Sequence, residues 1–198
     1  MLRIGITGGL GSGKSEVTRF FQERGARVFD ADAEAKLILL HSDEVQQAVL
    51  AAFGAAVLNE VGEIDFRLLA EQAFANPERQ RQLNEIIHPE VILAADQAMI
   101  KADQDRIDLF ILDAPLLFEG HLEEYLDLTI VVLAKEETRI RRALKRGNLT
   151  EEDIRRRIQL QLSDDEKRSR ADVVITNDGT LAQLHTKLDA LLTNLTRA

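Results

Sequence analysis

The sequence predicts an α/β fold in which helices cover both faces of a five-stranded parallel sheet, and three observations support this prediction. Five short apolar segments are separated by stretches with helical periodicity. Two of these segments are apolar without alternation, as strands buried on both faces are. A glycine-rich segment joins the first strand to the first helix. Because parallel sheets of this kind bind ligands beyond the carboxyl ends of their strands, we expect the functional residues there.

The first elements follow from the spacing of apolar residues. Residues 2–7 form a short apolar strand, and residues 14–24 have the amphipathic spacing of a helix, which a glycine ends. Residues 27–29 form a second short strand, which stops at Asp30 and Asp32. The sequence therefore places two carboxylates at the carboxyl end of a strand.

Residues 33–103 show helical periodicity and contain no convincing strand. A stretch of this length without strands indicates a helical insertion in the sheet fold. Glycine, proline and polar pairs predict breaks in the helical pattern near residues 41–43, 53–54, 61–62, 76–77 and 88–89. In this arrangement His88 and Pro89 stand at the start of a helix.

The second half of the chain returns to alternating strands and helices. Residues 107–112 and 128–133 are continuous apolar strands, the first of which closes on Asp113. Residues 172–176 form the fifth strand. The helices that accompany these strands are expected at residues 136–146, 150–162 and 181–195, the second with Thr150 as its N-cap and Asp153 three residues on.

Composition limits the function further. The 198 residues are 45% hydrophobic, which suits one domain, and the absence of cysteine excludes disulfides and thiolate metal sites and favours a reducing cytoplasm. No apolar run approaches the roughly 20 residues that span a bilayer. The formal charge of −9 disfavours a general nucleic-acid binder, but residues 135–170 contain 12 basic and 8 acidic residues. This local excess of positive charge indicates an anionic ligand.

Residues 8–15, Gly-Gly-Leu-Gly-Ser-Gly-Lys-Ser, fit the phosphate-binding P-loop motif and lie between a strand and a helix, as the motif requires. Glycines let successive backbone N–H groups face phosphate oxygens. We expect Lys14 to reach the β- and γ-phosphates of ATP and Ser15 to bind Mg²⁺. The other interpretation is a glycine-rich turn that only caps a helix. The predicted nucleotide site comprises Gly8, Gly9, Gly11, Ser12, Gly13, Lys14, Ser15 and Glu16.

Acidic residues at two strand ends extend this site. Asp113 stands where P-loop enzymes carry an acidic residue that holds the metal through water, although an aspartate can also simply end a strand. A kinase needs a carboxylate beside the acceptor hydroxyl, to orient it and accept its proton. We favour Asp32 over Asp30 for this role, and the alternative for both is capping of the following helix. Thr7, at the end of the first strand, is expected on the acceptor side.

Arg139, Arg142 and Arg146 are spaced three and four apart and therefore share one face of a predicted helix. Arginines can neutralise the charge that spreads over a transferring phosphoryl group. We favour Arg142 and Arg146 as catalytic residues. The alternative is a solvated surface helix in which Glu136 and Glu137 are their partners.

These motifs, in this order, resemble the dephospho-CoA kinase family over nearly the whole chain. The P-loop is shared by many families, whereas Asp-Ala-Asp, His-Pro and Pro-Leu-Leu-Phe-Glu together are far more selective. The resemblance rests on residues 4–15, 28–32, 83–84, 88–89 and 115–119, the arginine-rich helix, Gln161, and residues 171–172 and 177–179. The sequence departs from the family at Glu16, where Thr is usual, and at Arg146-Gly147-Asn148, where an Arg-Asp pair is common.

The resemblance implies transfer of the γ-phosphate of ATP to the ribose 3′-hydroxyl of dephospho-CoA, giving CoA and ADP. Asp32 matches the proposed base of the family. Residues 33–103 then form the acceptor-binding part, with His88 and Leu116 as contacts of the acceptor, and residues 136–170 form a lid.

Several of these roles have simpler alternatives. His88 is as well explained as a core residue that makes hydrogen bonds. Asn177 and Gly179 are expected at the adenine of ATP, against the alternative that they only make a turn. A kinase for another acceptor and a nucleotide-driven switch are the competing functions, although the Asn-Lys-x-Asp segment typical of GTP switches does not occur. We expect a cytoplasmic monomer or weak homo-oligomer that binds dephospho-CoA and neither nucleic acid nor membrane.

Overall fold

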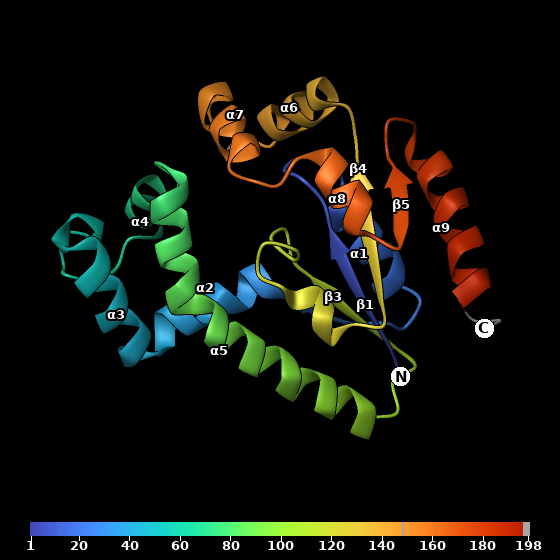
Figure 1. The fold of residues 1–198 in the computed structure, drawn as a ribbon, viewed down its shortest axis with the longest axis horizontal. Helices are drawn as coiled ribbons and strands as arrows, with labels where there is room; N and C mark the ends of the chain where they lie inside the picture. The colour runs from blue at the N-terminus through green and yellow to red at the C-terminus, as the bar shows by residue number, and fades with distance from the viewer. Residues whose placement is uncertain (148, 196–198) are drawn as a thin grey trace. The chain divides into compact units, whose positions relative to one another are not determined.

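The computed structural model describes residues 1–147 and 149–195 (Figure 1). The chain divides into two compact units, one formed by Met1–Phe29 with Met99–Ala198 and the other by Asp30–Ala98. The departure from the family pattern at Asn148 lies outside the described residues. The first unit contains the P-loop, whereas Asp32 and His88 belong to the second.

The sheet has the order β2-β3-β1-β4-β5 in the described chain. The strands are β1 (Leu2–Thr7), β2 (Arg27–Asp30), β3 (Leu109–Asp113), β4 (Leu128–Leu133) and β5 (Val173–Thr176). β1 pairs in parallel with β3 and β4, and β4 pairs in parallel with β5. The prediction of a five-stranded parallel sheet is confirmed. Because β1 is the central strand, the P-loop that follows it leaves the sheet at the middle of its carboxyl edge.

Helices connect the strands. They are α1 (Lys14–Gln22), α2 (Ala31–His41), α3 (Asp43–Phe53), α4 (Phe66–Ala73), α5 (Pro77–Gln104), α6 (Glu136–Lys145), α7 (Glu151–Gln159), α8 (Asp164–Arg170) and α9 (Leu181–Leu195), with the 3₁₀ helices η1 (Ala55–Val57) and η2 (Leu122–Tyr125). Figure 1 shows α1 behind the sheet and α8 in front of it, so both faces of the sheet carry helices.

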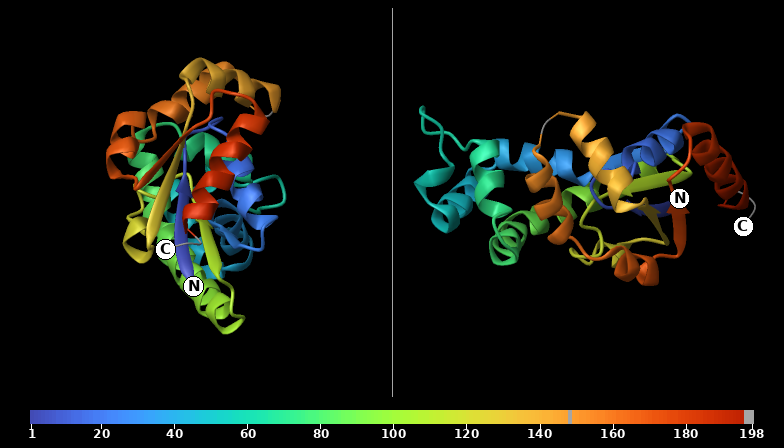
Figure 2. Two further views of the ribbon diagram at one scale, coloured as in Figure 1. Left: turned by 90° about the vertical axis from the view of Figure 1, so that its right-hand side faces the viewer. Right: turned by 90° about the horizontal axis from the view of Figure 1, so that it is seen from above.

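The core of the first unit lies between the sheet and the pair α1 and α9, which run side by side (Figure 2). Phe20 and Phe21 of α1 are buried against Ile4 and Ile6 of β1, and Leu188 of α9 closes the same cluster. Burial of one such side chain stabilises the fold by roughly 1.5–3 kcal/mol. This packing fixes the direction in which α1 leaves the P-loop.

The second unit is helical. Val45, Val49 and Phe53 recur on one face of α3 and are buried, and Leu69 of α4 is buried as well. This spacing is that of an amphipathic helix. The described residues between these helices include one isolated antiparallel bridge, between Leu58 and Ile64.

The predicted helix break at His88 and Pro89 is wrong, because α5 runs through both residues. Proline in a helix interior removes one backbone hydrogen bond and crowds the preceding turn. Ile87, Val91 and Ala95 lie on one face of α5 and are all buried. Burial of this face offsets the cost of Pro89, so His88 lies inside a helix and not at its start.

None of the helices in the described part of the chain is long and apolar enough to cross a membrane.

Candidate active site

The P-loop has the backbone geometry of an anion site. Gly11 and Gly13 have φ angles of 78° and 96°, in the left-handed region that favours glycine. Among the described residues, no backbone carbonyl accepts a hydrogen bond from the N–H groups of Gly11, Gly13, Lys14 or Ser15. Unpaired N–H groups at the N-terminus of a helix attract anions, and the helix dipole adds to this attraction. The loop can therefore bind a phosphate chain.

Asn177 and Arg142, two of the predicted site residues, lie against this loop. The Asn177 Nδ2 group donates to the Ser12 carbonyl oxygen at 2.9 Å, and Arg142 Nη1 donates to the same oxygen at 3.3 Å. Arg142 Nη1 also donates to the Asn177 carbonyl oxygen at 3.0 Å. A Cβ atom at Gly13 would overlap the Asn177 amide. Asn177 and Arg142 therefore hold the loop where only glycine fits. Gly179 is exposed.

Asp113 lies at the end of β3, and its carboxylate contacts two residues of α1. One oxygen forms an ion pair with Lys14 Nζ, and the other accepts a hydrogen bond from Thr18 Oγ1 at 2.8 Å. Only 5% of the Asp113 surface is exposed. Asp113 therefore does more than end a strand, because it links β3 to the helix that begins at the P-loop. Nearby in the fold, Thr7 Oγ1 donates to the Pro115 carbonyl oxygen at 3.1 Å.

The ligands for a metal ion at this site are oxygen atoms. Among the described residues, no group of three or more His, Cys, Asp or Glu side chains is arranged to hold a metal. Mg²⁺ needs no such group, since it commonly takes one or two protein oxygen ligands beside substrate phosphates and water. Ser15, which is exposed at the start of α1, and Asp113 offer a hydroxyl and a carboxylate of this kind. These residues fit a Mg²⁺ ion that arrives with a nucleotide.

Arg139 has a structural role that the sequence analysis did not assign. It is 5% exposed, and it forms an ion pair with Asp164 at 2.9 Å. Its Nε group donates to the Leu10 carbonyl oxygen at 3.1 Å. Arg146, which follows on the same helix face at the C-cap of α6, is exposed. The sequence contained one indication of this role: Arg139 is three residues from Arg142 and so lies on the same face of α6, and Arg142 also contacts the P-loop.

Besides Thr7 at the end of β1, the residues predicted on the acceptor side lie in α2, in α5 and in the segment after β3. In the second unit, Asp30 is the N-cap of α2 and accepts a hydrogen bond from the Ala33 N–H group at 3.0 Å. Asp32 lies in the first turn of α2 and is exposed, and His88 is half-buried in α5. In the first unit, Leu116 is half-buried in the segment after β3. The capping interpretation therefore applies to Asp30, and Asp32 is the remaining candidate for the base.

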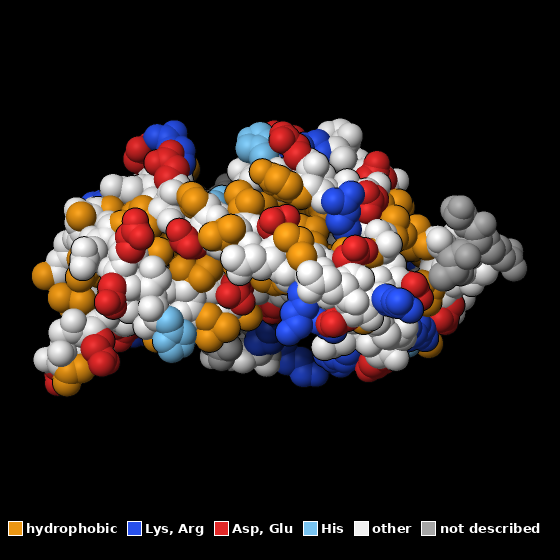
Figure 3. Space-filling view, turned by 90° about the horizontal axis from the view of Figure 1, so that it is seen from below, with side chains coloured by type: hydrophobic (Ala, Val, Ile, Leu, Met, Phe, Trp, Pro, Cys, Tyr) orange, Lys and Arg blue, Asp and Glu red, His pale blue; other side chains and the backbone are white. Residues whose placement is uncertain are grey.

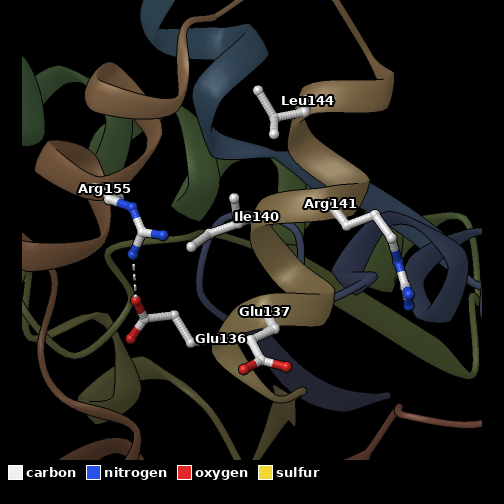
Figure 4. A pocket seen from close by; sticks show the side chains of 6 residues that line it. All are labelled: Glu136, Glu137, Ile140, Arg141, Leu144 and Arg155. Atoms are coloured by element: carbon white, nitrogen blue, oxygen red, sulfur yellow. Dashed lines mark hydrogen bonds and ion pairs between the residues drawn. The ribbon is translucent and has the colours of Figure 1, made fainter.

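A pocket of about 630 Å³ lies between α6 and α7 (Figure 4). Its lining residues are Glu136, Glu137, Ile140, Arg141, Leu144 and Arg155. Arg155 of α7 reaches Glu136 of α6 at 3.2 Å, as the dashed line in Figure 4 shows. At 100° per residue these α6 side chains project from a different face of the helix than Arg139 and Arg142. The pocket contains none of the predicted site residues.

Charge is unevenly placed at the surface. On the face shown in Figure 3, Lys and Arg side chains gather along part of the lower edge, whereas Asp and Glu side chains are spread over the remainder. The formal charge of the whole chain is −9. Attraction of an anion to the P-loop therefore depends on local groups, such as the unpaired N–H groups of the loop and Arg142, and not on the net charge.

The family model and the similar proteins of known name agree on one family. The family model described as dephospho-CoA kinase matches residues 2–183. A dephospho-CoA kinase from Salinibacter ruber is 42% identical over 187 residues, which cover 94% of this chain and 94% of that protein.

Solved structures support the fold. A crystal structure of a Thermus thermophilus protein has a TM-score of 0.77 and 35% identity, and the match covers 98% of this chain and 97% of that one. The dephospho-CoA kinase from Campylobacter jejuni has the same coverage, with a TM-score of 0.69 and 24% identity. The identity, the coverage and the match of the family model agree with the geometry of the loop, and the chain belongs to the dephospho-CoA kinase family.

Proposed function

We propose that this chain is an ATP-dependent kinase that phosphorylates the ribose 3′-hydroxyl of dephospho-CoA. The observation that carries the proposal is the P-loop, whose unpaired N–H groups lie at the N-terminus of α1 beside the ion pair of Lys14 and Asp113. The chain that contains this loop belongs to the dephospho-CoA kinase family. The loop accounts for binding of a triphosphate, and the family supplies the acceptor.

The nucleotide binds along residues 8–16. The unpaired backbone N–H groups of Gly11, Gly13, Lys14 and Ser15 donate to the β- and γ-phosphate oxygens. When ATP binds, the Lys14 ammonium leaves its ion pair with Asp113 and contacts these oxygens instead. Ser15 and Asp113 then hold Mg²⁺, which supplies positive charge to the phosphate oxygens when bound. Asn177 and Gly179 are proposed to contact the adenine of ATP, and Glu16 is proposed to lie beside the phosphates. Support for this arrangement comes from the contacts that already place Asn177 against the loop.

Asp32 is proposed as the base. It accepts the proton of the ribose 3′-hydroxyl while the oxygen forms a bond to the γ-phosphorus and the bond from that phosphorus to the β–γ bridging oxygen breaks. Its exposed position in the first turn of α2, where Asp30 already provides the cap, supports this role. His88, Leu116 and Thr7 are proposed to contact the acceptor, and residues 33–103 to bind it.

Arg142 and Arg146 are proposed to neutralise the charge on the transferring phosphoryl group. The half-buried Arg142 already donates to the carbonyl oxygen of the P-loop residue Ser12, and Arg146 follows one turn later on the same helix. Residues 136–170 are proposed to act as a lid that excludes water during transfer. The enzyme is proposed to work in the cytoplasm as a monomer or weak homo-oligomer, with no nucleic-acid or membrane partner.

The test is ADP release measured with Mg-ATP and a panel of acceptors. We expect release to depend on dephospho-CoA, with little turnover on shikimate or nucleosides. Preference for another acceptor would assign the chain to a different kinase specificity. Steady release without any acceptor would instead favour a nucleotide-driven switch and would contradict the proposal.

A further inference from the structure

The peptide groups of the P-loop residue Leu10 are held from two sides by residues distant in sequence. Its N–H group donates to Gln161 Oε1 at 3.2 Å, and its carbonyl oxygen accepts from Arg139 Nε at 3.1 Å. The Arg139 guanidinium also lies against Gly9, where a Cβ atom would overlap it. A residue fixed at both its N–H and its C=O group cannot rotate without breaking a hydrogen bond. Leu10 is therefore an anchor point of the loop.

Gln161 itself is held firmly. It lies in the short connection between α7 and α8, where the N–H group of the next residue, Leu162, donates to Glu119 Oε1 at 2.9 Å. Asp164, the first residue of α8, forms the ion pair with Arg139 at 2.9 Å. The first contact joins the segment after β3 to the connection that contains Gln161, and the second joins α6 to the start of α8, which follows that connection.

A buried ion pair completes this support. Lys167 of α8 is fully buried, and its Nζ atom is 3.8 Å from Glu119 Oε1. Burial lowers the pKa of Lys167, while the charge of Glu119 acts in the opposite direction. Removal of one partner of such a pair is costly, so Lys167 and Glu119 help to hold α8 beside the segment after β3.

We propose that Gln161 is a positioning residue for nucleotide binding, because its side-chain oxygen holds the Leu10 N–H group and thereby fixes the P-loop in its phosphate-binding form. This inference rests on the proposed function only in that the loop binds a nucleotide. Without Gln161, the half-buried Leu10 N–H group must find another acceptor, and rotation of its peptide displaces the neighbouring Gly9 and Gly11. The loop then has to be reordered whenever phosphate binds.

The expected effect is on the nucleotide and not on the acceptor. A typical hydrogen bond contributes about 1 kcal/mol, which corresponds to roughly a fivefold change in an equilibrium constant. Gln161→Met keeps the length of the side chain and removes the oxygen. We expect it to raise the Kd for ADP about 5- to 20-fold and to raise the KM for ATP similarly. The KM for dephospho-CoA should change less than about twofold, since Gln161 contacts the P-loop.

The experiment compares Gln161→Met with Gln159→Met, the same substitution at an exposed residue two positions away. Kd for ADP is measured by titration calorimetry, thermal unfolding is recorded in parallel, and hydrogen exchange is followed in the peptide that contains Leu10. We expect weaker ADP binding and faster exchange at Leu10 in Gln161→Met alone. If that variant does not fold, Gln161→Asn, which is one methylene shorter, tests the same contact.

An unchanged Kd for ADP in the Gln161 variant would overturn the inference, also when its thermal stability is lower, because the residue would then only support the fold. An equal loss of ADP binding in the Gln159 variant would overturn it as well. A wild-type protein that binds ADP but does not phosphorylate dephospho-CoA would refute the proposed function. In that case the ADP titrations still decide the role of Gln161.

Discussion

Asp30 and Asp32 lie two residues apart in one short motif, and the structure gives them different surroundings. Asp30 accepts the hydrogen bond from Ala33 that caps α2, whereas Asp32 lies exposed in the first turn. The cap fixes the start of the helix and therefore the place from which Asp32 projects. A substitution that keeps the cap should leave this geometry intact.

Substitution of Asp32 by asparagine tests its role as base. The amide retains the shape of the side chain but cannot accept the proton of the acceptor hydroxyl, so we expect kcat to fall by about 10²- to 10⁴-fold. The Kd for ADP should stay within about twofold of wild type. Asp30→Asn is the matched control, because Asn caps a helix about as well as Asp and should preserve turnover. Near-normal kcat in Asp32→Asn would rule out the proposed base.

Local sequence motifs predicted the P-loop and Asp113 but not the residues that hold the loop. The P-loop lies within eight consecutive residues, whereas Gln161 and Arg139 reach Leu10 across 151 and 129 residues of sequence. Contacts at such separations depend on how the strands are ordered in the sheet, which the residue pattern does not specify. The resemblance pointed to Gln161 without giving it a partner.

At the level of elements, the prediction was accurate where apolar runs were continuous. β1, β4 and α9 have the predicted bounds, since each has a clear apolar pattern. The Thr150 cap of α7 is confirmed, with its side chain accepting from the Asp153 N–H group. α8 was missed because its seven residues have no apolar periodicity. Its only signal was a capping box between Ser163 and Glu166, which the structure contains.

Pro89 gives a prediction for α5. Because it lies inside a continuous helix, Pro89→Ala restores a backbone donor and relieves crowding, and we expect the free energy of unfolding to rise by up to about 3 kcal/mol. Pro77→Ala is the control. Pro77 is the first residue of the same helix, where proline is tolerated, so this change should be nearly neutral. Urea unfolding of both variants measures the difference, and equal effects would show that position in the helix is irrelevant.

At the scale of the molecule, one ion pair joins the central strand β1 to the segment that precedes β4. The Arg3 guanidinium donates to Asp127 at 2.6 and 3.1 Å, and the Arg3 N–H group donates to the same carboxylate at 2.8 Å. Hydrogen bonding from the Arg3 side chain lowers the pKa of Asp127, against an opposing effect of burial. The ion pair therefore stabilises the fold at pH values at which Asp127 is ionised.

The sign of this effect predicts how stability depends on pH. Since the pKa of folded Asp127 lies below its ordinary value of 3.8, its stabilisation is complete above that value and is lost as the pH falls through the folded pKa. Asp127→Asn should lower the free energy of unfolding at neutral pH by up to about 1 kcal/mol, a small effect because the pair is partly exposed.

Urea unfolding at neutral pH and at about pH 3 measures this dependence. The difference between wild type and Asp127→Asn should shrink at the lower pH. Asp189→Asn is the control, since its ion pair with Arg24 is a single exposed contact at 3.1 Å and should contribute little at either pH. A difference that grows as the pH falls would contradict the assigned direction.

Identification of the phosphorylated product tests the central claim most directly. The protein is incubated with Mg-ATP and dephospho-CoA, ADP is quantified, and the acceptor is analysed by phosphorus NMR and mass spectrometry. The account predicts one phosphate added per ADP released, located on the ribose 3′-oxygen. ADP formed without a phosphorylated acceptor, or phosphate on any other oxygen, would contradict it.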